Sequence, residues 1–322
     1  MRHWVFGFGL ATLLIANAYA DGYLWLSAAG SAPASVYRYN LRTGRVDRVV
    51  HPGAWGFVQS GDYNLLAYDG DALYIGMEND RTLLKVNPYT GAFRSAFGYN
   101  MCNCFYGHHL MKDGAFYEGE LWRAAPARAE GSPGILFVSS ASGEPTNAFY
   151  AMNQPDLQPI GLEAVGDALV LTTEQGIYRV QLTEEPLVFE ALPYTLSGVP
   201  AGHTLGGLAY DAERGVLYLA SAHNGSTTLW RLTLNHEAQT AIAEPVDSLT
   251  LKGYPTGRRP TAMGFVPARA GDANDDGCVD DADLLQVLFQ FGSSDLASDL
   301  NRDGVVDDAD LLLVLFQFGN GC

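Results

Sequence analysis

The sequence predicts an all-β domain of repeated small sheets, followed by a small α-helical domain. Short apolar phrases typical of β-strands recur at nearly regular intervals through residues 21–268. The chain has 36 glycines and 15 prolines among 322 residues and is rich in aromatic side chains, as expected where many short strands are joined by turns. Residues 269–322 differ, because within them one acidic loop occurs twice, each time before an apolar stretch with the length of a short helix.

The first 20 residues have the pattern of an export signal. Arg2 precedes the apolar run Trp4–Ala16, and Ala18–Ala20 has the small-x-small form of a cleavage site. The mature chain is therefore expected to begin at Asp21. No later stretch approaches the ~20 apolar residues of a membrane helix, so no membrane span is predicted. We expect a secreted or extracellular protein, associated with a cell surface through a partner.

Three strand-like phrases recur in the same order along residues 21–268. The phrase that is last in each repeat begins at Val36, Leu83, Ile135, Ile177 and Leu229, which are 42 to 52 residues apart. A second phrase precedes each of these, at 23–26, 72–75, 115–117, 168–171 and 216–219. A third phrase comes before the second, at 65–69, 109–113, 161–165, 207–211 and 261–266.

The order of these phrases predicts a closed ring. The first repeat has no third phrase upstream, and the copy at 261–266 supplies it if it pairs with the strand at 23–26. Strands at this period, four to a repeat, resemble a β-propeller of about five blades. A pair of stacked β-sandwiches is the competing fold, but it does not explain why the missing phrase returns at the end.

The two acidic loops have the spacing of calcium-binding loops. Each places oxygen-bearing side chains at loop positions 1, 3, 5, 9 and 12, a glycine at position 6 and a backbone carbonyl at position 7. A calcium ion takes six to eight oxygens, and a twelve-residue loop with this glycine brings them to one centre. Two calcium ions are therefore predicted. Their ligands are Asp272, Asn274, Asp276, Cys278, Asp280 and Asp283 in the first loop, and Asp299, Asn301, Asp303, Val305, Asp307 and Asp310 in the second.

The paired loops and their exit helices, 284–291 and 311–318, each stopped by a glycine, resemble a type I dockerin module. The resemblance covers residues 271–322 and implies a cohesin-like protein partner in a bacterial polysaccharide-degrading assembly, or attachment to a surface component. It assigns partner contacts to loop positions 10, 11, 17 and 18. These are Asp281, Ala282, Leu288 and Phe289 in the first copy and Asp308, Ala309, Leu315 and Phe316 in the second. Because the two sets are identical, the resemblance implies that a partner can bind either face after a half-turn.

Four cysteines in an exported chain favour disulfide formation. A bridge between Cys278 and Cys322 would join the first loop to the end of the chain, and it is the favoured pairing. Cys102 and Cys104 are then left to pair with each other or to stay reduced. A zinc site that includes the nearby His108 and His109 is the sharper alternative for them.

The net charge and the aromatic residues indicate which classes of ligand the protein can bind. The formal net charge is −17, of which residues 271–322 contribute −11 through twelve Asp and one Arg, so nucleic acid binding is not predicted. Segments between repeats are rich in rings and arginines that suit a carbohydrate-binding face. The alternative is that these rings pack the loops against the blades. The residues concerned are Trp55, Phe57, Tyr99, Phe105, Tyr106, His108, His109, Tyr194, His203, Tyr254, Arg258 and Arg259.

No catalytic residue is assigned from the sequence. Asp62, Asp113, Glu163 and Asp211 fall near the predicted inner strands and could converge on the channel, but turn residues would follow the same register. The chain contains no nucleophile elbow, phosphate loop or zinc-protease motif. The favoured interpretation is a non-catalytic calcium-binding interaction protein. The alternative is a propeller glycoside hydrolase or lyase in polysaccharide catabolism, recruited through the dockerin-like tail.

Overall fold

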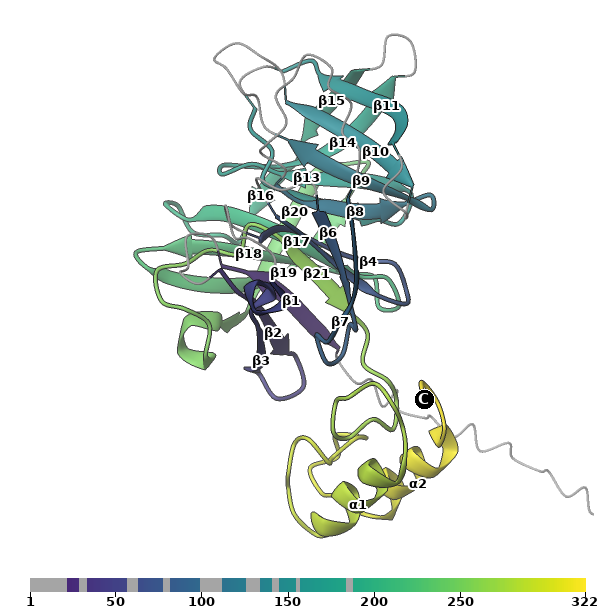
Figure 1. The fold of residues 1–322 in the computed structure, drawn as a ribbon. Coiled ribbons are helices and arrows are strands. Elements are labelled where there is room, and N and C mark those ends of the chain that lie inside the picture. The colour runs from purple at the N-terminus through teal and green to yellow at the C-terminus, as the bar shows by residue number, and fades with distance from the viewer. Residues whose placement is uncertain are drawn as a thin grey trace, which may run out of the picture. The chain divides into compact units, whose positions relative to one another are not determined.

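A computed structural model describes residues 22–28, 34–56, 63–77, 82–98, 112–125, 134–140, 145–154, 157–183 and 188–322. The described chain divides into two compact units, a β-rich domain that ends at Ala268 and a tail that begins at Arg269 (Figure 1). In the described part of the chain, no helix is long and apolar enough to cross a membrane.

The β-rich domain is built from five blades of four antiparallel strands, so its fold is β-propeller-like. The first blade has β1 (Tyr23–Ser27), β2 (Val36–Asn40) and β3 (Arg45–Val50), with β21 (Met263–Val266) as its inner strand. The second has β4 (Tyr63–Tyr68), β5 (Leu73–Met77), β6 (Thr82–Val86) and β7 (Phe93–Gly98). The third has β8 (Gly114–Tyr117), β9 (Glu120–Ala125), β10 (Ile135–Ser140) and β11 (Pro145–Met152).

The last two blades follow in chain order. The fourth has β12 (Gly161–Val165), β13 (Ala168–Thr172), β14 (Ile177–Thr183) and β15 (Val188–Pro193), and β15 also pairs in parallel with β11 of the third blade. The fifth has β17 (Thr204–Asp211), β18 (Val216–His223), β19 (Ser226–Asn235) and β20 (Thr240–Ser248), with the short β16 (Thr195–Ser197) beside β20. Two 3-10 turns, Pro52–Trp55 and Leu249–Lys252, lie between strands.

The ring closes between the two ends of the domain. Strand β21 pairs antiparallel with β1, with Tyr23 opposite Val266 and Leu26 opposite Met263, which confirms the predicted pairing. The inner strands β21, β4, β8, β12 and β17 each contact the inner strands of the two neighbouring blades. They therefore surround a central channel.

The core of this domain lies between blades. Five clusters of buried apolar side chains are present, one for each pair of adjacent blades. Successive side chains of a strand point to opposite faces. Tyr23 and Trp25 of β1 therefore pack toward the second blade, whereas Leu24 and Leu26 pack toward the fifth. This arrangement explains why the central strands are apolar at every position instead of every second one.

In the third blade, two strands lie at other residues than the sequence predicted. Residues 115–117 were predicted as the second strand and 109–113 as the inner strand, but the inner strand is β8 and the second is β9. The turn between them is Glu118-Gly119, whose two residues have φ of 53° and 81°, as in a tight hairpin turn. Residues 109–111 lie outside the described chain.

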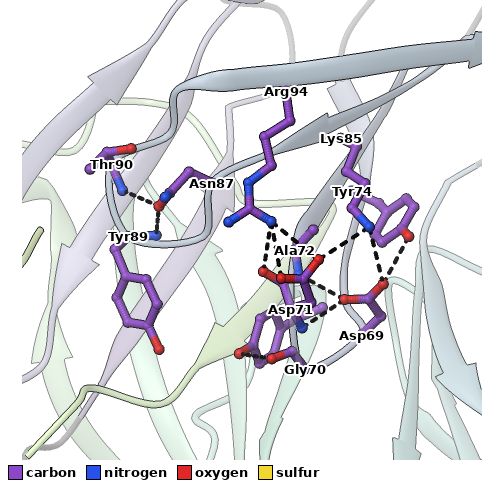
Figure 2. Close-up of polar contacts among 11 residues, drawn as sticks. Asp69, Gly70, Asp71, Ala72, Tyr74, Lys85, Asn87, Tyr89, Thr90 and Arg94 are labelled. Atoms are coloured by element: carbon purple, nitrogen blue, oxygen red, sulfur yellow. Dashed lines mark hydrogen bonds and ion pairs between the residues drawn. The ribbon is translucent and has the colours of Figure 1, made fainter. Parts of the chain in front are cut away.

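Aspartate and asparagine side chains close the turns that repeat from blade to blade. Asn40 and Asn87 each accept the backbone N–H groups two and three residues ahead, which explains the recurring Thr-Gly turns. Asp69 does the same for Asp71 and Ala72 and also accepts the Tyr74 hydroxyl at 2.8 Å (Figure 2). Around it, Lys85 and Arg94 approach Asp71 to 3.3 and 3.2 Å (Figure 2).

The tail consists of two loop–helix units with near-identical structure. Helix α1 spans Asp281–Phe289 and α2 spans Asp308–Gln317, so each begins three residues before the predicted start. The units interlock, because Val279 of the first loop exchanges backbone hydrogen bonds with Gly319 and Asn320 after α2. The second loop makes the equivalent bonds to the segment after α1, through Val306, Gly292 and Ser293. A shared core of Ala273, Val279, Val287, Leu300, Val306 and Val314 holds them together.

The turn at Asp69 gives a test of the blade architecture. Its side chain is 19% exposed and satisfies two backbone N–H groups and a tyrosine hydroxyl, whereas that of Asp71 is 70% exposed and makes surface ion pairs. We expect Asp69→Ala to lower the free energy of unfolding by roughly 1–3 kcal/mol. The matched variant Asp71→Ala should cost at most about 0.5 kcal/mol. Urea unfolding followed by tryptophan fluorescence measures both, and equal losses would contradict the assignment.

Candidate functional site

The first acidic loop of the tail is folded around its own carboxylates. Asp272 Oδ2 accepts the Gly277 N–H at 2.8 Å, and Asp276 Oδ1 accepts the Cys278 N–H at 2.9 Å. Asn274 Oδ1 accepts the Asp276 N–H at 2.9 Å. The chain reverses through Gly277, which has φ of 90°. The side chains at positions 1, 3 and 5 are thus gathered on the inside of the loop.

The last acidic residue of each loop ties the loop to the helix that follows. Asp283 Oδ1 accepts the N–H groups of Ala273 and Asn274 at 2.8 and 3.0 Å, and Oδ2 accepts that of Asp280 at 2.9 Å. Asp280 in turn caps α1 by accepting the Ala282 N–H at 2.8 Å. The second loop repeats these contacts 27 residues later through Asp310, Leu300, Asn301, Asp307 and Ala309.

The second loop also repeats the interior of the first. Asp299 Oδ2 accepts the Gly304 N–H, Asn301 Oδ1 accepts the Asp303 N–H, and Asp303 Oδ1 accepts the Val305 N–H, each at 2.9 to 3.0 Å. The backbone at position 4 is left-handed in both copies, with φ of 61° at Asp275 and 63° at Arg302. Two sequences that share one register therefore share one loop geometry.

The electrostatics of the loops suit a hard cation. Burial, together with the neighbouring carboxylates of Asp275, Asp283 and Asp276, raises the pKa of Asp272 to about 7. Burial also raises the pKa of Asp283. In the second loop, Asp299 Oδ1 is buried and no described residue forms a hydrogen bond with it. An oxygen-only donor set with such a group fits a calcium ion, which would relieve the repulsion among these carboxylates.

Cys278 and Cys322 form a disulfide, with Cα atoms 4.7 Å apart. The bridge joins Cys278, at position 7 of the first loop, to Cys322. The ligand atom that Cys278 can offer to a calcium ion is therefore its backbone carbonyl oxygen. Cys278, Asp280 and Cys322 also place potential ligand atoms within 4.8 Å of one another. They do not form a thiolate metal site, since both sulfurs are in the disulfide. Cys102 and Cys104, with His108 and His109, lie outside the described residues.

The residues that the dockerin resemblance assigns to a partner lie on the outside of the helices. Phe289 and Phe316 are each 79% exposed, and Leu288 and Leu315 are nearly half exposed. Asp281, Ala282, Asp308 and Ala309 are exposed at the starts of the helices. The structure adds exposed apolar residues that the motif did not include, namely Leu285, Phe291, Leu312 and Phe318. Their identical 27-residue register is the sequence signal that could have identified them.

Two of the four carboxyl groups predicted near the propeller axis lie within the ring of inner strands. Asp113 precedes β8 and is fully buried, and its Oδ1 accepts the Gly114 N–H at 3.0 Å and the Leu66 N–H of β4 at 3.5 Å. Glu163 of β12 accepts the Ala164 N–H at 2.8 Å and the Tyr210 N–H of β17 at 3.2 Å. Both groups thus satisfy N–H groups on the inner edges of the blades.

The two carboxyl groups influence each other. Burial raises the pKa of Glu163 to about 8, against the lowering effect of its two backbone hydrogen bonds. Burial raises the pKa of Asp113 well above its usual range, and the charge of Glu163 adds to this effect. Within the described parts of the chain, no arginine or lysine contributes to either pKa shift. The axis therefore holds two acids without a basic partner among the residues that set their pKa values.

A cavity of about 230 Å³ opens onto this region. Residues from all five inner strands line it, and Glu163 is among them. Asp211 also lines the cavity, but its Oδ1 closes the turn at Glu213 and Arg214 and its Oδ2 pairs with the Arg214 guanidinium at 3.2 Å. Asp211 is therefore a turn residue, the alternative that its register suggested. Asp62 lies outside the described chain.

Two of the rings considered for a carbohydrate-binding face pack into the domain instead, which is the alternative stated for them. Tyr254 is buried and donates to the Ser27 carbonyl at 2.6 Å, and Tyr194 is buried beside His236. Trp55 packs against Phe93, and the His203 ring stacks on His223 at 5.1 Å. Arg258 accepts a hydrogen bond from Thr227 through its backbone carbonyl. Phe57, Tyr99, Phe105 and Tyr106 lie outside the described residues.

A second cavity, of about 520 Å³, is lined by residues around the starts of the inner strands. Arg259 lies in its wall and donates to Glu174 at 3.1 Å, with Lys112, Tyr178 and Gln175 nearby. The Arg259 Nη1 atom is buried and has no hydrogen-bond partner among the residues that the structure describes. Polar donors beside an aromatic ring suit a small polar ligand.

The two carboxyl groups at the propeller axis, Asp113 and Glu163, predict that the stability of the metal-free β-rich domain depends on pH. The folded chain keeps the Glu163 proton up to about pH 8, while the unfolded chain loses it near its ordinary pKa of 4.5. Stability of the β-rich domain should therefore fall as pH rises from about 5 to 8, by up to about 1.4 kcal/mol per pH unit. Urea unfolding in chelator, followed by tryptophan fluorescence, measures this slope. Glu163→Gln should reduce it, and a slope unchanged in that variant would contradict the assignment.

Comparisons with known proteins identify no family. No protein-family model matches the sequence, and no curated protein is significantly similar to it. Similar solved structures include a nidogen/laminin complex, with 9% identity and a TM-score of 0.43 over 76% of this chain and 97% of that chain. They also include Myxococcus xanthus glutaminyl cyclase, with 11% identity and a TM-score of 0.43 over 69% and 87%. An endo-arabinase from Bacteroides thetaiotaomicron has 14% identity and a TM-score of 0.42 over 56% and 76%.

Proposed function

We propose that this protein is an exported, non-catalytic calcium-binding interaction protein. Its tail, residues 269–322, is a type I dockerin-like module that takes two calcium ions and attaches the propeller-like domain to a cohesin-like module or a cell-surface component. The observation that carries the proposal is the repetition of loop geometry, helix capping and exposed apolar residues in one 27-residue register. A solvated acidic segment would not be expected to repeat its loop geometry, its helix caps and its exposed apolar residues together.

The exposed faces of α1 and α2 support binding through either helix. Phe289 and Phe316 have equal exposure, and each is flanked by a half-exposed leucine. Large exposed apolar patches mark interaction sites, and aromatic side chains supply much of the binding energy at such sites. A partner that fits one face should fit the other after a half-turn. Its groove is expected to be apolar with a basic rim, because residues 271–322 carry a net charge of −11.

The propeller-like domain is proposed to present a binding face, with carbohydrate as the ligand class. The cavity beside Arg259 supports this role, since it combines guanidinium and amide donors with the Tyr178 ring. The alternative, a glycoside hydrolase or lyase, needs two carboxyl groups that reach the substrate. Asp113 is fully buried and Asp211 is held in a turn, so the described residues support binding better than hydrolysis.

Calcium binding by the tail can be measured on the full chain by isothermal titration calorimetry. Asp283→Asn should remove one equivalent of bound calcium and Asp310→Asn another, because each changes the last ligand of its loop. Asp281→Asn is the matched control, since that exposed side chain lies at position 10 and is expected to leave the stoichiometry unchanged. A double variant that binds as much calcium as the wild type would refute the two predicted sites.

Partner binding can be measured with immobilised cohesin modules in calcium. Phe289→Ala or Phe316→Ala alone should weaken binding only about twofold, because the other face remains, whereas the double variant should lose roughly 100-fold or more. Chelator should abolish binding by all of them. Leu296→Ala is the control, an exposed apolar residue between the two loop–helix units. Binding that survives in the double variant would exclude these faces.

A further inference from the structure

The propeller axis contains a charge arrangement that the tail and its partner do not explain. The Asp113 carboxyl lies between two neighbouring inner strands, because it interacts with the Leu66 amide of β4 and the Leu162 amide of β12. It therefore turns into the ring. Its Oδ1 accepts the Gly114 and Leu66 N–H groups, whereas among the described residues its fully buried Oδ2 has no partner with hydrogen-bond geometry.

An oxygen in this position needs a partner in either protonation state. If the carboxyl is ionised, a negative charge is buried beside Glu163. If it is protonated at Oδ2, the hydroxyl lacks an acceptor there. Native proteins satisfy nearly all such groups, with protein, water or an ion. The unpartnered Oδ2 is therefore evidence for an additional occupant.

The cavity at the axis indicates the charge of that occupant. Its lining contains three acidic residues, Glu163, Asp211 and Glu213, and none of the described residues that line it is basic. Of these three, Asp211 pairs with the Arg214 guanidinium at 3.2 Å. The field at the cavity therefore favours a cation over an anion. Glu163 lines the cavity together with Ala115 and Phe116 of β8, the strand that Asp113 directly precedes, so the cavity adjoins the backbone segments that carry both acids.

We propose that the propeller-like domain holds a hard divalent cation on its axis, bound by Glu163 and Asp113 and reached through the 230 Å³ cavity. Carboxylate oxygens prefer calcium, magnesium or manganese over softer metals. Such an ion compensates the charges of both acids and occupies the unpartnered side of Asp113. It holds β8 and β12 together at the centre of the ring.

The site can be isolated within the full chain. The variant Asp283→Asn/Asp310→Asn disables the tail loops and leaves the β-rich domain unchanged. After dialysis against calcium or manganese and removal of free ion, elemental analysis should find about one bound equivalent per chain. Adding Glu163→Gln should remove it, and Asp113→Asn should do the same. Glu213→Gln, an exposed acid of the same cavity, is the matched control and should retain the ion.

Thermal stability gives a second readout that does not require counting bound ions. All five tryptophans lie at or before Trp230, so tryptophan fluorescence reports on the β-rich domain and not on the tail. In the tail-disabled chain at pH 8, calcium or manganese should raise the thermal midpoint by several degrees relative to chelator. Glu163→Gln should abolish the response.

Two results would overturn the proposal. One is a tail-disabled chain that binds no calcium or manganese and has the same thermal midpoint with and without these ions, which would mean that the two acids share a proton. The other is one bound equivalent that persists in Glu163→Gln. The proposal is independent of the tail function. If the tail sites fail, the wild type should still bind one ion, and if the axial site fails, it should bind two.

Discussion

Burial of both faces of every blade is the constraint on which the β-rich domain depends. A strand such as β1 is buried along its whole length, with Trp25 packed toward one neighbour and Leu24 toward the other. An open row of blades would leave an apolar face exposed at each end, at a cost of about 25 cal/mol for each Å². The pairing of β21 with β1 removes both ends by closing the ring. The inner strand of the first blade must therefore come from the other end of the domain.

Closure of the ring creates a second requirement at its centre. Each inner strand is an edge strand, whose free N–H and C=O groups face its neighbours across the channel. Asp113 and Glu163 accept four of these N–H groups, but ionisation of either carboxyl is then opposed by burial, which raises the pKa of both. The same two side chains thus satisfy the backbone and generate the electrostatic imbalance that an axial cation would relieve.

The tail also holds carboxylates close together, but different contacts hold its structure in place. Its carboxylates are close together because the loops fold around them, and few apolar residues oppose their repulsion. The interlocked backbone bonds at Val279 and Val306, together with the Cys278–Cys322 disulfide, hold each loop against the end of the other unit. The helices are then left with exposed phenylalanines on the outside, which is favourable only where a partner covers them.

The sequence by itself determined the features that depend on local order. The strand period, the return of the inner-strand phrase at 261–266, the loop register and the Cys278–Cys322 pairing follow from spacing, because each reflects a short segment repeated or completed. Only the tertiary structure decided which acids face the axis and which close turns, because Glu163 and Asp211 both belong to inner-strand phrases and differ in what they contact. In the third blade, the inner strand and the second strand are β8 and β9 instead of the segments predicted from the sequence. The left-handed turn at Glu118-Gly119 divides the two strands there, and the apolar pattern did not predict it. The tertiary structure also placed Tyr194 and Tyr254 in the core, where burial of their rings depends on neighbours distant in the chain.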